Sequence, residues 1–132
     1  MKTSIKFLHW TPRILTIVAT LFISIFALDA FEGDQSVWQH ILGFLIHLIP
    51  TYIMTAILIV AWKWELVGGI IFATIGLITS PMVFMVNYNR NHNFWMDLGI
   101  IGLITFPFIL IGVLFILSHI SKKKSRKIAS AV

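Results

Sequence analysis

The stretch LGIIGLITFPFILIGVLFIL, residues 98–117, decides the fold of this chain. It carries no charged side chain and is long enough to cross a membrane, because a helix of roughly 20 apolar residues spans the hydrocarbon core. Three more apolar runs precede it, at about residues 12–31, 37–61 and 66–86. Backbone groups in hydrocarbon need hydrogen-bond partners within the protein, so these runs are expected to be helices. The sequence therefore predicts an all-α, integral membrane four-helix bundle.

The composition agrees with a single transmembrane domain over residues 1–132. Hydrophobic residues make up 58% of the 132 residues, charged residues only 11%, and the mean hydropathy is +0.94. A soluble domain carries about 25% charged residues, and a disordered chain combines low hydrophobicity with high charge, so both classes are excluded. The chain has no cysteine, which excludes a disulfide framework and a thiolate metal site.

The basic residues predict how the four spans are oriented. Nine of the ten lie before the first span, between the second and third spans, or in a basic tail at residues 118–132, whereas Arg90 lies on the opposite side. Basic residues near span ends accumulate in the cytoplasm. Both termini are therefore predicted to be cytoplasmic, and the net charge of +5 follows from topology rather than from nucleic-acid binding. The tail is expected to attract anionic lipid headgroups.

The N-terminal segment also has features of a signal peptide. Two lysines precede an apolar run that ends in the small-residue stretch at residues 27–30. Arg13 lies late for such a segment and Asp29 would sit beside the cut, so an uncleaved first span is the preferred interpretation. A cleaved chain would have three spans and an outer N-terminus.

Aromatic and small residues predict how the bundle is anchored and packed. Indole rings prefer the headgroup level of a membrane, and a lysine between two of them faces lipid phosphate. The predicted interfacial anchors are Trp10, Trp62, Lys63, Trp64 and Trp95. In the third span, Gly69, Ala73, Gly76 and Ser80 form one stripe of small residues, which predicts close packing against another helix.

The second span is the most polar, and His40, His47, Pro50 and Thr51 form its candidate intramembrane polar face. The two histidines are seven residues apart, so they point within about 20° of each other on a helix. An ionisable residue near mid-membrane is a candidate functional residue, although a histidine can also be satisfied inside the bundle. Pro50 cannot donate a backbone hydrogen bond, which frees the carbonyl of Ile46 for His47 to contact.

Three further residues, Asp29, His92 and Asp97, are candidate partners at the outer face. Asp29 and His40 should lie at similar depths, although a solvated outer loop is the preferred interpretation for Asp29. No spacing typical of a metal site links these residues, and two histidines on one helix cannot ligate one haem iron. No nucleophile–base pair, phosphate-binding glycine loop or pair of carboxylates is present. We therefore expect no catalytic residue, no metal and no cofactor, and hence no enzyme.

Several stretches resemble a family of small bacterial inner-membrane proteins of unknown function. They are LHWTPR at residues 8–13, FALDAF at 26–31, HLIP at 47–50 and AWKWE at 61–65, continued by Gly68 and Gly69. The resemblance covers about residues 7–80 and is looser in the fourth span. It implies a multi-pass protein of the bacterial inner (plasma) membrane and no particular activity. The size and four-span layout are also similar to those of DoxX-like membrane proteins, by analogy of architecture without a shared motif.

These features predict a structural or accessory subunit that works with a membrane-protein partner or as a homo-oligomer. One bundle without a soluble domain leaves little room for a catalytic apparatus. A small transporter or proton-relay protein that uses the second-span face is the alternative, and a membrane-embedded redox or lipid enzyme is the weaker one. The two halves of the sequence share little beyond hydropathy, which gives no support to an inverted-repeat transporter.

Reporter fusions test the predicted topology. A fusion after Lys63 and one after Val132 should both report the cytoplasm, and one after Arg90 should report the outer side, because basic flanks stay in the cytoplasm. An external signal from the C-terminal fusion would contradict the four-span topology.

Overall fold

The computed structural model describes residues 3–34 and 36–131, which are mostly helical and contain no strand. In chain order the elements are α1 (Thr3–Ile25), the short 3-10 helix η1 (Phe26–Phe31), α2 (Val37–His47), α3 (Ile49–Lys63), α4 (Glu65–Asn91), α5 (Phe94–Ile104) and α6 (Phe106–Ala129). Four segments are long and apolar enough to cross a membrane, at Thr3–Phe31, Val37–Lys63, Glu65–Asn91 and Phe94–Ala129. The predicted helical class and the four apolar segments are therefore confirmed.

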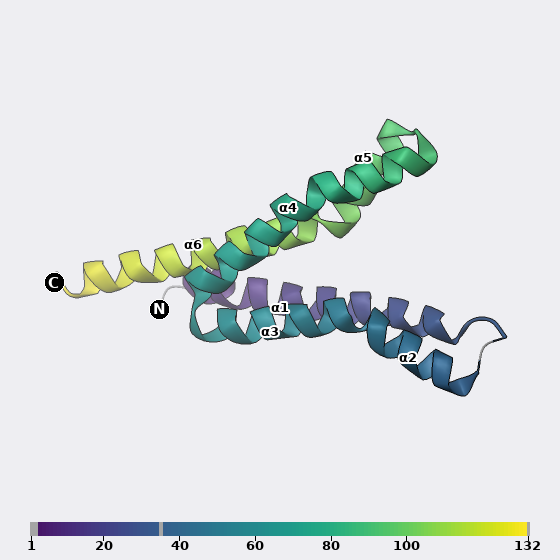
Figure 1. Cartoon of the computed structure of the whole chain (residues 1–132). Helices are drawn as coiled ribbons and strands as arrows, with labels where there is room; N and C mark the ends of the chain where they lie inside the picture. Colours follow the sequence, from purple (N-terminus) through teal and green to yellow (C-terminus); the bar gives the residue numbers. More distant parts are fainter. Residues whose placement is uncertain (1–2, 35, 132) are drawn as a thin grey trace.

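The helices form two hairpins that meet at one end and diverge at the other (Figure 1). In the first hairpin α1 lies along α3, and in the second α4 lies along α6, with α5 towards the far end (Figure 1). At the end where the hairpins meet, α6 packs on α1 and α3 packs on α4. We call this the joined end. The start of α1 lies there, and the basic part of α6 extends beyond it as a continuous helix to Ala129.

Each hairpin contains one broken helix, and the two breaks follow the same plan. α2 gives way to α3 at Leu48, and α5 gives way to α6 at Thr105. In both cases a proline, Pro50 or Pro107, follows at the start of the next helix. A proline has no amide hydrogen and crowds the preceding turn, so a continuous helix is interrupted just before it.

The hairpins share further features around these breaks. A serine hydroxyl of the unbroken helix contacts a threonine hydroxyl beside the break, at 3.3 Å for Ser24 and Thr51 and at 2.9 Å for Ser80 and Thr105. A side-chain cap also opens both α2 and α5. The expectation that the halves share little beyond hydropathy was therefore wrong. Because each hairpin starts at the joined end, the shared plan is a parallel repeat and not an inverted one.

The buried apolar core lies between α3, α4 and α6. Its members are Met54, Ile57, Ala61, Phe72, Ile111 and Phe115. The rings of Phe72 and Phe115 stack almost parallel, with centroids 6.1 Å apart and an interplanar angle of 3°. This core holds the second hairpin together and attaches α3 to it.

Glycines allow α4 and α6 to approach closely. A Cβ atom on Gly112 would lie 2.5 Å from the amide nitrogen of Ala73 and 2.6 Å from the carbonyl oxygen of Gly69. A Cβ atom on Gly76 would lie 2.6 Å from a side-chain carbon of Ile109. Only a residue without a side chain permits this backbone contact. The predicted packing role of the small-residue stripe in the third span is confirmed.

The α4–α6 contact can be tested with Gly112→Ala. The added methyl group must push the two backbones apart, which should lower the free energy of unfolding by about 1–3 kcal/mol. The midpoint of unfolding of the detergent-solubilised protein measures this loss. Gly99→Ala is the matched control, because nothing lies within 4 Å of its added Cβ. Equal midpoints for the two variants would contradict a tight contact at Gly112.

Candidate functional site

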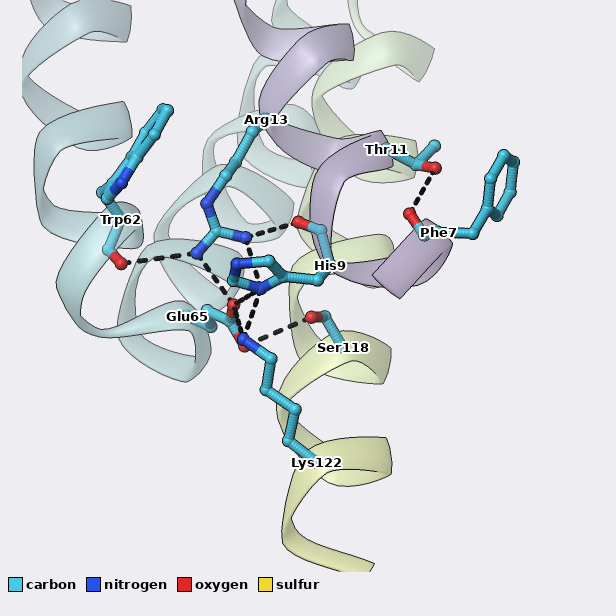
Figure 2. A network of polar contacts seen from close by, with 8 residues as sticks. All are labelled: Phe7, His9, Thr11, Arg13, Trp62, Glu65, Ser118 and Lys122. Carbon is cyan, nitrogen blue, oxygen red and sulfur yellow. Dashed lines mark hydrogen bonds and ion pairs between the residues drawn. The ribbon is translucent and has the colours of Figure 1, made fainter. Parts of the chain in front are cut away.

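A single carboxylate, that of Glu65, links three helices at the joined end (Figure 2). Its Oε1 atom lies 2.8 Å from Arg13 Nη2, 2.7 Å from Lys122 Nζ and 2.7 Å from His9 Nδ1. The hydroxyl of Ser118 donates to Oε2 at 3.2 Å. We call these five residues the Glu65 cluster. It joins α1, α4 and α6 through side chains far apart in the sequence.

Local sequence places each member of the Glu65 cluster on the correct face. His9 and Arg13 are four residues apart on α1, and Ser118 and Lys122 are four residues apart on α6, so each pair projects from one side of its helix. Glu65 is the first residue of α4. A carboxylate is favoured at a helix N-terminus because the unpaired amide groups there carry partial positive charge.

Arg13 is the most deeply buried cation of the cluster, with only 2% of its surface exposed. Its Nη2 donates to the carbonyl oxygen of Trp62 at 3.3 Å, and its Nη1 donates to the carbonyl oxygen of His9. The guanidinium also lies over the rings of Trp62 and Phe115, at 5.3 Å and 5.7 Å from their centroids. Arginine therefore reaches from α1 to α3, α4 and α6, and aromatic faces stabilise its charge.

The cluster is built to hold helices together. The Glu65 side chain is 8% exposed, so its charge needs compensation within the protein. The ring nitrogen of His9 also lies 2.9 Å from Arg13 Nη1 and contacts Lys122 Nζ. This nitrogen donates to Glu65 when it carries a proton and accepts from Arg13 or Lys122 when it carries none, so it has a partner in either tautomer. The carboxylate is thus fully engaged by neighbouring donors.

The two histidines of the predicted second-span face have separate surroundings. His40 is half-buried, and its Nδ1 lies 2.7 Å from the carbonyl oxygen of Ala30. His47 is exposed, and its Nδ1 lies 2.8 Å from the carbonyl oxygen of Gly43 on its own helix. His47 thus contacts the Gly43 carbonyl and not the Ile46 carbonyl that Pro50 was expected to free.

The other two residues of that predicted face lie at the helix break. Thr51 contacts Ser24 of α1, and Pro50 lines an apolar pocket described below. The structure thus gives each member of the face a different neighbour. A relay along His40, His47 and Thr51 stays a prediction.

The predicted outer-face residues differ in burial. Asp29 is exposed in η1, and His92 is exposed at the end of α4 with a φ of 49°. Asp97 on α5 is completely buried, and neither of its carboxylate oxygens has a hydrogen-bond partner among the described residues. In the described part of the chain, no three His, Cys, Asp or Glu side chains are grouped to hold a metal ion.

The predicted interfacial anchors all have exposed side chains. Trp10 and Trp62 meet edge to face, with centroids 6.2 Å apart, and the Lys63 ammonium lies 5.3 Å from the ring centroid of Trp64. Trp95 lies at the far end, on α5, and is 79% exposed. Contact with lipid headgroups stays a prediction for these residues.

Sequence reasoning missed the Glu65 cluster as a site. It identified Glu65 only as the one acid on the basic side of the bundle, and Arg13 only as a late basic residue. Taken together, these two facts could have indicated an ion pair between Glu65 and Arg13. A lone acid among many basic residues at a span end, and a basic residue at the start of an apolar run, each need a partner of opposite charge.

The chain belongs to the family described as a domain of unknown function, DUF7670, which matches residues 1–127. That range includes the whole Glu65 cluster and both helix breaks. No curated protein and no solved structure matches the chain. The expected resemblance to a family of unknown function is confirmed at this level.

The holding role of the cluster can be tested with Glu65→Gln. The amide leaves two buried or half-buried cations without their counter-charge, which should lower the free energy of unfolding by about 3–5 kcal/mol. Chemical or thermal unfolding of the detergent-solubilised chain measures the loss.

The matched control for this change is Glu32→Gln, because Glu32 is exposed and its side chain forms none of the described ion pairs. It should shift stability by at most about 0.5 kcal/mol. If both variants unfold at the same midpoint, the cluster does not hold the hairpins together.

Proposed function

We propose that the chain is a non-enzymatic accessory subunit of the bacterial inner membrane that receives a transmembrane helix of a partner protein between its two hairpins. Both termini lie in the cytoplasm in this proposal, as the nine basic residues on that side favour. The observation that carries the proposal is an apolar pocket of about 540 Å³ bounded by both hairpins.

Every residue that lines this pocket is apolar. They are Ala19, Phe22 and Ile23 of α1, Pro50 and Met54 of α3, Leu103 and Ile104 of α5, and Pro107, Phe108 and Ile111 of α6. Ligand pockets that recognise small polar molecules place a few polar groups among apolar ones. Side chains of this kind instead suit an apolar occupant. Within a bilayer, such an occupant is either another helix or a lipid chain.

Open glycines on α5 favour a helix as the occupant. A Cβ atom added to Gly99 or Gly102 would meet nothing within 4 Å, whereas one added to Gly69 or Gly112 would collide with a neighbouring helix. Gly99 lies one turn before Leu103, which lines the pocket, so the two share a face of α5. Small residues let transmembrane helices approach closely, so a helix seated in the pocket would also cover this glycine face.

The Glu65 cluster supports a role without catalysis. A general base needs an accessible carboxylate or imidazole, whereas the Glu65 carboxylate is buried and contacted by four side chains. A cluster of this kind fixes the relative placement of helices. That is the requirement for a subunit that presents a preformed groove.

One observation favours the alternative role in transport. Broken helices in transporters flank the binding site, and Pro50 and Pro107 beside the two breaks both line the apolar pocket. In transporters, however, the backbone groups freed at such breaks coordinate a polar substrate or ion. Since no polar side chain lines the pocket, the accessory role is the one that we propose.

Site-directed photo-crosslinking in native membranes tests the proposal. A photoreactive amino acid replaces Leu103, which lines the pocket and is 66% exposed. We expect one protein adduct of defined mass, and we expect Gly102→Leu to abolish it, because the added side chain occupies the space over the glycine face. Thr74→Leu is the matched control, since it places the same leucine at an exposed position on α4, outside the pocket lining, and should leave the adduct intact.

Three outcomes would count against the proposal. An adduct with lipid alone would assign the pocket to an acyl chain. An adduct at twice the mass of this chain would replace the separate partner by a second copy. An adduct that survives Gly102→Leu would place the contact elsewhere on α5.

A further inference from the structure

We propose that a basic pocket at the joined end binds the phosphate of an anionic lipid headgroup. This inference concerns a different pocket from the apolar pocket of the proposed function, and it does not depend on that pocket. It rests on the geometry of the pocket, its surplus of positive charge and the indole rings in its wall.

The basic pocket has a volume of about 520 Å³ and is bounded by α1, α3, α4 and α6. Its polar lining comes from His9, Arg13, Lys63, Glu65, His119, Lys122, Lys123 and Arg126. A smaller pocket of about 250 Å³ shares His9, Lys122 and Arg126 with it, so the recess continues along α6. A concave site of this size accommodates a group larger than a bare ion.

Positive charge exceeds negative charge in this pocket. Five lining side chains are cationic, and Glu65 is the one carboxylate among the lining residues. That carboxylate is already paired with Arg13 and Lys122. Among the described residues, none of the ion pairs includes Lys63, Lys123 or Arg126. Three cations therefore face the recess without an acidic partner, and an anion would complete the site.

The surrounding residues place the pocket at the level of headgroups. The indoles of Trp62 and Trp64 line it, and such rings gather where the hydrocarbon core meets water. Leu66 and Val67 also line it and remain exposed. A lipid whose phosphate is held by the cations would place its acyl chains on that apolar edge. Basic pockets between helices on the cytoplasmic side bind phosphate headgroups in this way, and the arginine fork suits phosphate oxygens.

Free phosphate has the same charge chemistry, and the apolar edge favours the lipid. Purified full-length chain in a non-ionic detergent is titrated with short-chain phosphatidylglycerol, with phosphatidylcholine of the same chain length, and with inorganic phosphate. Binding is followed by native mass spectrometry and by the rise in unfolding temperature that ligand binding produces. We expect binding of phosphatidylglycerol at least about tenfold tighter than binding of either other probe.

Two double variants separate the pocket from the general charge of the tail. Lys123→Gln with Arg126→Gln removes two lining cations that Glu65 does not need, and should weaken phosphatidylglycerol binding by about tenfold or more. Lys124→Gln with Lys127→Gln removes the same charge from the same helix outside the pocket, and should change binding less than about twofold.

Each contrary result overturns a stated part of the proposal. Equal losses in the two double variants would mean that the tail attracts lipid diffusely and that the pocket is not a site. Equal binding of inorganic phosphate and phosphatidylglycerol would overturn the assignment to a lipid headgroup. Both results are independent of the crosslinking at Leu103. A failure of the lipid-binding proposal would therefore not contradict the proposed binding of a partner helix in the apolar pocket.

Discussion

The structure depends on one buried negative charge at the joined end. The Glu65 side chain is only 8% exposed, so water solvates its carboxylate little, and its charge is compensated by counter-charges inside the protein. Glu65 obtains its counter-charges from Arg13 of α1 and Lys122 of α6, which lie 52 and 57 residues away from it in the sequence. Since the guanidinium of Arg13 also bonds to the last turn of α3, all four long helices are tied at the same level. This requirement determines where the hairpins meet.

Attachment at one end explains why the remainder of the molecule has two different halves. Near the cluster, Gly69 and Gly112 bring backbones into direct contact and the stacked phenylalanines fill the space beside them. Farther along, the hairpins diverge, and each second helix breaks at a proline. The glycines of α5 find no neighbour there. Close packing at one end and an apolar groove at the other are therefore consequences of the same arrangement.

Hydropathy was sufficient to predict the helical class and the four apolar segments, and the spacing of small residues was sufficient to predict the stripe, because each is a property of one segment. The breaks were not predicted, although Pro50 and Pro107 were visible. Prolines are tolerated inside transmembrane helices, so their presence alone does not show whether a helix bends or ends. The Glu65 cluster and the burial of Asp97 were missed because they depend on which helices become neighbours. The shared plan of the hairpins was missed because it lies in a helix cap, a helix break and one hydroxyl contact in each hairpin, which leave the hydropathy pattern unchanged.

The basic segment of α6 carries two groups of residues, one that pairs with Glu65 and one that lines the basic pocket. Residues four apart lie on one face of a helix, so Ser118 and Lys122 both point to Glu65. These two side chains help to hold the hairpins together. Lys123 and Arg126 border the recess beside that face, without acidic partners. An anion bound by these two side chains would interact with positive charges that do not pair with Glu65. Its binding would therefore leave the attachment of the hairpins intact. The same reasoning holds for the apolar groove, whose lining shares no residue with the cluster. Occupancy of either pocket would therefore add to the stability given by Glu65 instead of competing with it.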